Sequence, residues 1–359
     1  MTGDPTQDKK MEGEKPFLSI IITAFNNEPV VGSALKSALQ QTLASIEIIV
    51  IDDGSTDKTS MVIRNIDPGG KKVRYHYQQN SGIAAARNQA MTLVSGIFFA
   101  FLDADDTLSP DFAETLHQRF LESVLPPDLF ILDFYEERKK GGLTPVHFDT
   151  QLLRYYEKEP SDAALLIADR FASVWAKAYR TGFVSEHQLR FHPSKTLEDM
   201  FFILDLLACR PVICHVPVYA YYYLYNPDSL SRNLDLATFQ NRENAVRHYL
   251  LKYKSFREAD YFISFFSNRI FMQFVLSFSG NVVKDQRRAV FYRTMQYLQE
   301  AVETLKTATG YTSVFSRIKL KKTKSVFLLF CLIKPVYRLS RPVSYFMIRM
   351  VGMVYRYRK

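Results

Sequence analysis

The sequence predicts an α/β fold in which helices flank a mostly parallel sheet, followed by a helical appendage toward the carboxyl-terminal end. Residues 17–23 and 46–51 are short apolar segments rich in β-branched side chains, as is typical of buried parallel strands. Between them, residues 30–41 repeat apolar side chains at helical spacing. Because strand and helix alternate, successive strands are expected to run parallel in one sheet with helices on its faces.

The alternation continues beyond these segments and then gives way to helical spacing without strand patterns over residues 235–306. This change indicates that a sheet domain precedes the helical appendage. Further strands are expected at residues 73–77, 97–102, 128–134, 212–216 and 219–224, and further helices at residues 57–66, 83–94, 196–208 and directly after Pro110.

Composition divides the chain into four parts. Residues 1–15 have no aromatic side chain and mix both charges, which predicts a disordered leader. Residues 16–225 are expected to form the sheet domain, residues 226–315 the helical appendage and residues 316–359 a basic tail.

The basic residues are concentrated in that tail. The chain has a net charge of +9, yet residues 316–359 hold twelve of its 46 Lys and Arg and none of its 37 Asp and Glu. The rest of the chain carries a charge of −3 and has no nucleic-acid-binding motif, so no nucleic-acid partner is expected. Lysines beside the apolar segment 326–333 predict helices lying on an anionic membrane surface; the alternative is an arm packed on the body. These lysines are Lys319, Lys321, Lys322 and Lys324.

The sequence also indicates a compartment. The first fifteen residues lack the apolar core of a secretion signal, and no segment reaches the roughly 18 uninterrupted apolar residues that span a bilayer. Cys209, Cys214 and Cys331 form no Cys-x-x-Cys pair, which suits idle thiols in a reducing compartment. We therefore expect a cytoplasmic protein, peripheral on the inner face of the cell membrane.

Polar segments follow three of the expected strands, at residues 23–28, 52–57 and 103–106. Ligands of such sheets bind outside the carboxyl ends of the strands, so these segments are candidate binding loops. The clustered carboxylates of residues 103–106 suit a divalent cation shared with a diphosphate; the alternative is a capping turn for the helix at Pro110. Residues 52–57 have a similar alternative, an ordinary turn before the next helix.

Five segments together resemble the family 2 glycosyltransferases of the GT-A fold. The resemblance covers residues 17 to about 231 and includes, in order, SIIITAFNNE, IEIIVIDDGSTD, NSGIAAARNQA, FFAFLDADD and the pair Glu198-Asp199. It implies inverting transfer of a sugar from a nucleotide-diphosphate sugar, with UDP the expected nucleotide, to a carbohydrate or lipid-linked glycan acceptor. Capsule, lipopolysaccharide or related bacterial surface glycan synthesis is the implied setting.

The resemblance also implies residues for the donor. Thr23, Phe25, Glu28 and Asp53 match the positions that hold the nucleotide base. Phe25 departs from the usual Tyr, so stacking is kept while a hydroxyl hydrogen bond is lost.

Three further positions complete the implied donor site. Arg87 would lie near the base or the diphosphate, Asp103 would meet the ribose, and Asp105 would ligate Mn²⁺ or Mg²⁺. Arg232 is a candidate closing contact to the diphosphate, or else a solvated surface residue.

The acceptor side follows from the later motifs. The resemblance implies that Asp199 is the catalytic base and Glu198 its neighbour or an acceptor contact; the alternative is a pair of acids favoured at a helix amino terminus. Trp175 and Lys177 are acceptor-side candidates, although Trp175 is equally a candidate core residue. The rival function is a non-catalytic nucleotide-sugar or carbohydrate-binding protein on the same fold.

Overall fold

In a computed structural model of the protein, the described residues are 15–158, 167, 171–194 and 197–227. The chain divides into two compact units, Met1–Pro227 and Asp228–Lys359. The described residues all belong to the first unit. Nearly all of the expected leader, appendage and basic tail, with Arg232 and the tail lysines, therefore lies outside the described residues. Within the described part, no helix is both long and apolar enough to cross a membrane.

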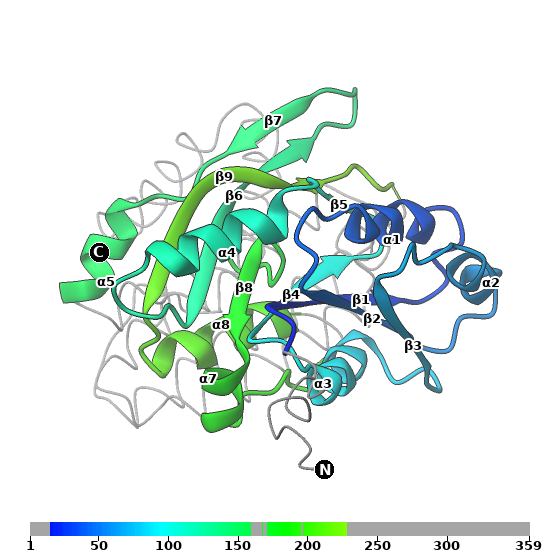
Figure 1. Cartoon of the computed structure of the whole chain (residues 1–359), viewed down its shortest axis with the longest axis horizontal. Helices are drawn as coiled ribbons and strands as arrows, with labels where there is room; N and C mark the ends of the chain where they lie inside the picture. The colour runs from blue at the N-terminus through cyan, green and yellow to red at the C-terminus, as the bar shows by residue number, and fades with distance from the viewer. Residues whose placement is uncertain (1–14, 159–166, 168–170, 195–196, 228–359) are drawn as a thin grey trace, which may run out of the picture. The chain divides into compact units, whose positions relative to one another are not determined.

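One mixed sheet forms the centre of this unit (Figure 1), and the predicted α/β class with a mostly parallel sheet is confirmed. Its strand order is β3-β2-β1-β4-β8-β6-β9-β5, with β7 paired to β6. β1 pairs in parallel with β2 and β4, and β6 with β9, whereas β8 runs antiparallel between β4 and β6. The strands are β1 Leu18–Ala24, β2 Ile46–Asp52, β3 Lys72–Tyr77, β4 Phe98–Asp103, β5 Thr107–Leu108, β6 Leu129–Glu137, β7 Leu143–Val146, β8 Lys177–Arg180 and β9 Ile213–Tyr223.

Helices cover both faces of the sheet. Figure 1 shows α1, α2 and α4 on one face, and α3, α7 and α8 on the other. The helices are α1 Val31–Leu39, α2 Thr59–Arg64, α3 Ile83–Leu93, α4 Phe112–Glu122, α5 Gln151–Lys158, α7 Thr181–Glu186 and α8 Glu198–Ala208.

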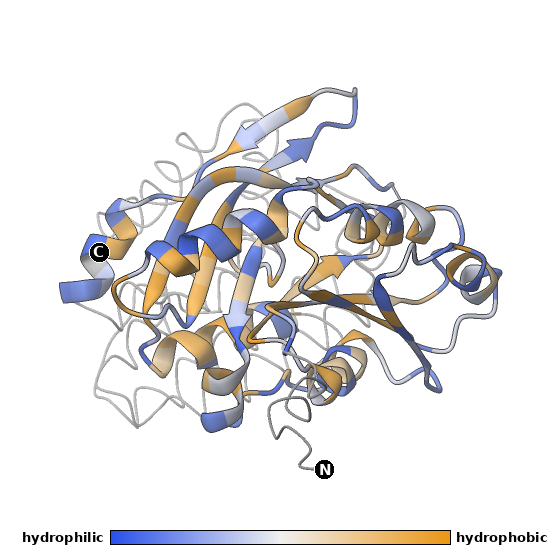
Figure 2. Cartoon of the chain, viewed as in Figure 1, coloured by the Kyte–Doolittle hydropathy of each residue, from blue (hydrophilic) through white to orange (hydrophobic). Residues whose placement is uncertain are grey.

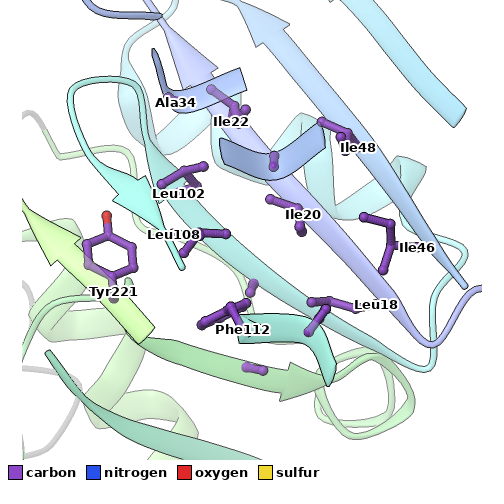
Figure 3. Close-up of a cluster of buried hydrophobic side chains, with 14 of the residues drawn as sticks. Leu18, Ile20, Ile22, Ala34, Ile46, Ile48, Leu102, Leu108, Phe112 and Tyr221 are labelled. Carbon is purple, nitrogen blue, oxygen red and sulfur yellow. The ribbon is translucent and has the colours of Figure 1, made fainter. Parts of the chain in front are cut away.

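Burial on both faces explains why most residues of the first two strands are apolar. Every residue of β1 and β2 is buried, and Figure 2 shows the central strands in the colour of apolar residues. On the face of α1, Leu18 and Ile20 pack with Ala34 and Phe112, as Figure 3 shows. Each such large apolar side chain stabilises the fold by about 1.5–3 kcal/mol.

A buried carboxylate joins the amino-terminal ends of β1 and β2, where Ser19 lies beside Glu47. Glu47 of β2 is fully buried and accepts hydrogen bonds from the hydroxyls of Ser19 and Ser95, each at 2.7 Å, while Arg74 pairs with it at 2.9 Å. Burial raises the pKa of Glu47, but these hydrogen bonds and the Arg74 charge outweigh it, so the pKa lies below the usual value.

The structure departs from the expected elements after β4. The two strands expected at residues 212–216 and 219–224 are one strand, β9, whose register with β6 shifts around Asp133. β5, β7, β8, α5 and α7 were not expected, because each is only two to eight residues long. β8, for example, reads KAYR and becomes a strand only by pairing with β4 and β6.

Candidate active site

The carboxyl ends of β1, β2 and β4 meet at one edge of the sheet. The strand register pairs Ala24 with Asp52 and Thr23 with Asp103. The three polar segments that follow these strands therefore lie side by side, as the sequence predicts. These three segments are the first part of the candidate site.

Asp53 organises the loop that follows β3. Its Oδ1 accepts hydrogen bonds from the Gln78 side chain at 2.7 Å and the Ser81 amide at 2.9 Å, and its Oδ2 accepts the Gly82 amide at 2.8 Å. The Asp53 carboxylate, which was expected to contact the nucleotide base, thus accepts three hydrogen bonds from this loop. Gly54 has a φ of 80° and lies against the Asn80 backbone, where a side chain would clash.

The other donor-side candidates lie on the first loop. Thr23 is almost fully buried in β1, whereas the Phe25 ring is 44% exposed at the sheet edge, where a flat ligand could stack on it. Glu28 accepts the Lys58 amide at 3.1 Å and donates its own amide to Asp57 at 3.0 Å, which joins this loop to the start of α2.

Arg87 brings three of the predicted carboxylates together. It lies on α3, is 3% exposed, and its Nη2 donates to Asp103 at 3.1 Å. Its Nη1 donates to Glu198 at 3.2 Å and also to Asp199. One guanidinium thus bridges the end of β4 and the start of α8, two segments about a hundred residues apart in sequence.

Burial and like charges shift the titration of these groups. Burial raises the pKa of Asp199 to about 7, with Arg87 lowering it and Glu198 raising it. Burial likewise raises the pKa of Asp103 to about 6, although Arg87 opposes the rise. Burial lowers the pKa of Lys177 to about 7, and the charge of Asp199 opposes that change. Carboxylates with a pKa near neutrality are suited to proton transfer at physiological pH.

The start of α8 is held in an uncommon backbone conformation. Leu197, which precedes Glu198, has a φ of 65° in the left-handed region. A branched residue there costs about 1–3 kcal/mol, and such strain is often found where a side chain must be aimed. Glu198 and Asp199, the two residues that follow Leu197, both contact Arg87.

Asp105 and Asp106 have different surroundings. Asp106 is buried and accepts the Tyr221 hydroxyl at 2.6 Å and the Leu224 amide at 2.9 Å, so it braces β9 against the end of β4. Asp105 is partly exposed, and its Oδ2 accepts the Asn226 side-chain amide at 2.8 Å.

A divalent cation suits this edge of the sheet. Among the described residues no cluster of three or more His, Cys, Asp and Glu could hold a metal by itself. Mg²⁺ and similar ions in diphosphate sites instead use one or two carboxylates plus the phosphates. Three carboxylates, those of Asp103, Glu198 and Asp199, pair with the single cation Arg87. Asp105 is partly exposed and is not among these partners, so its carboxylate is the candidate metal ligand of residues 103–106.

The acceptor-side candidates lie next to this network. Trp175 stacks on Tyr221 and Tyr223, with ring centroids 4.9 and 5.0 Å apart, and meets Phe134 edge-on. These contacts match its alternative as a packing residue. Lys177 is 2% exposed and donates to the Ser173 carbonyl at 2.7 Å.

Sequence reasoning did not find the aromatic residues that pack against Arg87 and Asp106. The rings of Phe101 and Phe191 lie 5.6 and 5.4 Å from the Arg87 guanidinium, and the Tyr221 hydroxyl reaches Asp106. The sequence carries no signal of these contacts, because only the folded chain brings the aromatic rings to Arg87 and Asp106.

Comparison with known proteins identifies the domain. The family described as Glycosyl transferase family 2 matches residues 19–161. These residues belong to glycosyl transferase family 2. The family 2 segment includes Asp53, Arg87, Asp103 and Asp105, while Glu198 and Asp199 follow it within the same compact unit.

Relatives agree with this membership. The putative glycosyltransferase EpsH of Bacillus subtilis (strain 168) is 26% identical over 234 residues, which cover 64% of this chain and 66% of EpsH. Chondroitin synthase of Escherichia coli is 37% identical over 105 residues, covering 29% of this chain and 15% of that protein. The matched segments therefore span less than two thirds of the length of either relative.

A solved structure shares the fold. The crystal structure of residues 1–349 of S. aureus TarS superposes with a TM-score of 0.59 at 18% identity, covering 81% of this chain and 82% of that chain. The predicted GT-A type of fold is thereby confirmed.

Proposed function

We propose that this protein is an inverting glycosyltransferase that moves a sugar from a nucleotide-diphosphate sugar to a carbohydrate or lipid-linked glycan acceptor. The observation that carries the proposal is the convergence of Asp103, Glu198 and Asp199 on Arg87 within a chain that has a family 2 domain. Because the three carboxylates pair with one guanidinium, they lie close together, and this supports a site in which donor and acceptor sugars are held side by side.

In the proposed reaction Asp199 is the general base. The acceptor hydroxyl gives its proton to an Asp199 carboxylate oxygen as the hydroxyl oxygen bonds to C1 of the donor sugar. The bond between C1 and the diphosphate oxygen breaks on the opposite face, and its electron pair leaves with the nucleoside diphosphate. Configuration at C1 is inverted because one displacement occurs. The Asp199 side chain is 24% exposed, so an acceptor can reach it.

The donor would occupy the edge formed by β1, β2 and β4. Phe25 would stack on the base, Asp53 would hold the loop that borders it, and Asp103 would accept a ribose hydroxyl. Asp105 would hold a divalent cation with the diphosphate. Such an ion would supply charge neutralisation to the leaving group.

UDP is our choice of donor nucleotide. TarS residues 1–349, which share this fold, have been crystallised with UDP and with UDP-GlcNAc. Bacterial surface polysaccharide is our choice of setting, and the relationship to a chondroitin synthase supports polysaccharide as the product class. We place the enzyme on the inner face of the membrane through its basic tail.

Screening tests the proposal. The full chain is incubated with UDP-, GDP- and dTDP-sugars, Mn²⁺ and glycan acceptors, and release of nucleoside diphosphate is measured. We expect release with one nucleotide class and its loss with EDTA. Donor binding without release or transfer under any of these conditions would favour the non-catalytic binding protein.

A further inference from the structure

Asp199 is surrounded by charged and titratable groups from four elements. Arg87 of α3 donates to it, and Glu198 of α8 shares that guanidinium. The groups that act on Asp199 or on this guanidinium are Arg87 of α3, Asp103 of β4, Lys177 and Tyr179 of β8, and Glu198 of α8.

Among these groups, Arg87 alone is a permanent cation. Burial lowers its pKa, but the charges of Asp199, Asp103 and Glu198 raise it further, so the guanidinium stays charged at every physiological pH. Lys177 has a pKa of about 7 and is therefore only partly charged near neutrality. Tyr179 is buried, and its pKa lies well above the usual value, so it stays neutral.

The position of Arg87 does not depend on Asp199. Its Nη2 donates to Asp103, its Nη1 also reaches Glu198, and the rings of Phe101 and Phe191 lie within 6 Å of the guanidinium. Because the planar guanidinium is already held by Asp103, Glu198 and the two rings, it can fix the orientation of the Asp199 carboxylate.

From this geometry, and resting on the proposed function, we propose that Arg87 is a positioning residue for the transfer. It favours the ionised form of Asp199 in a partly buried site and holds that carboxylate at a fixed angle beside Asp103. The role differs from the contact with base or diphosphate that the family resemblance implies for Arg87, because it acts through the base rather than on the donor.

Electrostatics explains why the site needs this cation. Burial disfavours the charged form of Asp199, and the neighbouring Glu198 disfavours it further. An adjacent arginine typically lowers the pKa of an aspartate by about 1–3 units. Without Arg87, Asp199 would hold its proton at neutral pH and could not accept one from the acceptor.

The first test is the pH dependence of transfer by the full chain. For Arg87→Met we expect the acid limb of kcat/KM to move up by about 1–3 pH units relative to the wild type. Arg87→Lys keeps a charge but not the fork, so we expect a smaller shift. The matched control is Arg180→Met, which removes a pair with Asp128 at the other end of β4, where Phe98 pairs with Arg180. We expect its acid limb to match that of the wild type.

The second test does not need turnover. The full chain is labelled with ¹³C at aspartate side-chain carboxyls, the Asp199 signal is assigned by its loss in Asp199→Asn, and it is titrated by NMR. We expect Asp199 to titrate at higher pH in Arg87→Lys than in the wild type, and Arg180→Met to leave it unchanged. Equal titration in the wild type and Arg87→Lys, or an unmoved acid limb in a folded Arg87 variant, overturns the inference.

The two tests separate this inference from the proposed function. If no nucleotide sugar supports transfer, the proposed function fails, while the titration still decides whether Arg87 controls Asp199. If transfer occurs and Arg87 leaves the titration unchanged, the function stands and the positioning role is wrong.

Discussion

Replacement of Asp199 by Asn tests the proposed base with little change in shape. After the substitution Arg87 keeps Asp103 at 3.1 Å and Glu198 at 3.2 Å, so no buried cation is left unpaired. We therefore expect the free energy of unfolding to change by only about 1–2 kcal/mol. The lost function is proton acceptance, which is worth about 10²–10⁴ in kcat, or roughly 3–5 kcal/mol of activation free energy.

The assay measures kcat with saturating donor and acceptor, together with the donor Kd by calorimetry. We expect Asp199→Asn to bind donor about as well as the wild type, because the proposed role of Asp199 is toward the acceptor hydroxyl and Asn keeps the shape of the side chain. Asp205→Asn, on the same helix, is the matched control and should keep normal turnover. Turnover by Asp199→Asn above about a tenth of the wild-type rate would refute a general-base role, since proton acceptance contributes more than that.

Three further predictions concern metal, stability and membrane. Asp105→Ala should lose Mn²⁺-dependent donor affinity, measured by calorimetry, while Asp111→Ala, an exposed acid before α4, should not; equal affinities would remove Asp105 from the metal site. Glu47→Gln should lower the free energy of unfolding by about 1–3 kcal/mol at pH 7. Because the folded-state pKa of Glu47 lies below its usual 4.5, the difference in Tm should persist above that pH and narrow as pH falls below it; a difference independent of pH would contradict this. Replacement of the four lysines within residues 319–324 by Glu should weaken flotation of the full chain with anionic liposomes but not its transfer to a soluble acceptor. Unchanged flotation would favour the packed arm.

The sequence predicts the amino-terminal half of the sheet well because that half is locally consistent. Residues 18–24 and 46–52 are mostly apolar and every one of them is buried, as strands covered on both faces require. β8 could not be predicted, because Lys177 opens a four-residue strand that only its neighbours create. Long-range pairing decides such a segment.

In the candidate site, too, some features could be predicted from the sequence and others could not. The positions of Asp103 and Asp199 follow from motifs, and the structure places both at Arg87. That junction could not be read from spacing, since Arg87 and Asp199 are separated by 112 positions. The left-handed conformation of Leu197 is also invisible in the sequence, because a leucine gives no sign of it.

The configuration of the product tests the proposed mechanism most directly. The wild-type chain is incubated with its nucleotide-sugar donor and acceptor, and the anomeric configuration of the newly bonded sugar is determined by NMR. A single displacement with Asp199 as base predicts a configuration opposite to that of the donor, and at least about a hundredfold less product from Asp199→Asn over the same time. Product with the configuration of the donor retained would contradict the single displacement that the carboxylates around Arg87 are proposed to support.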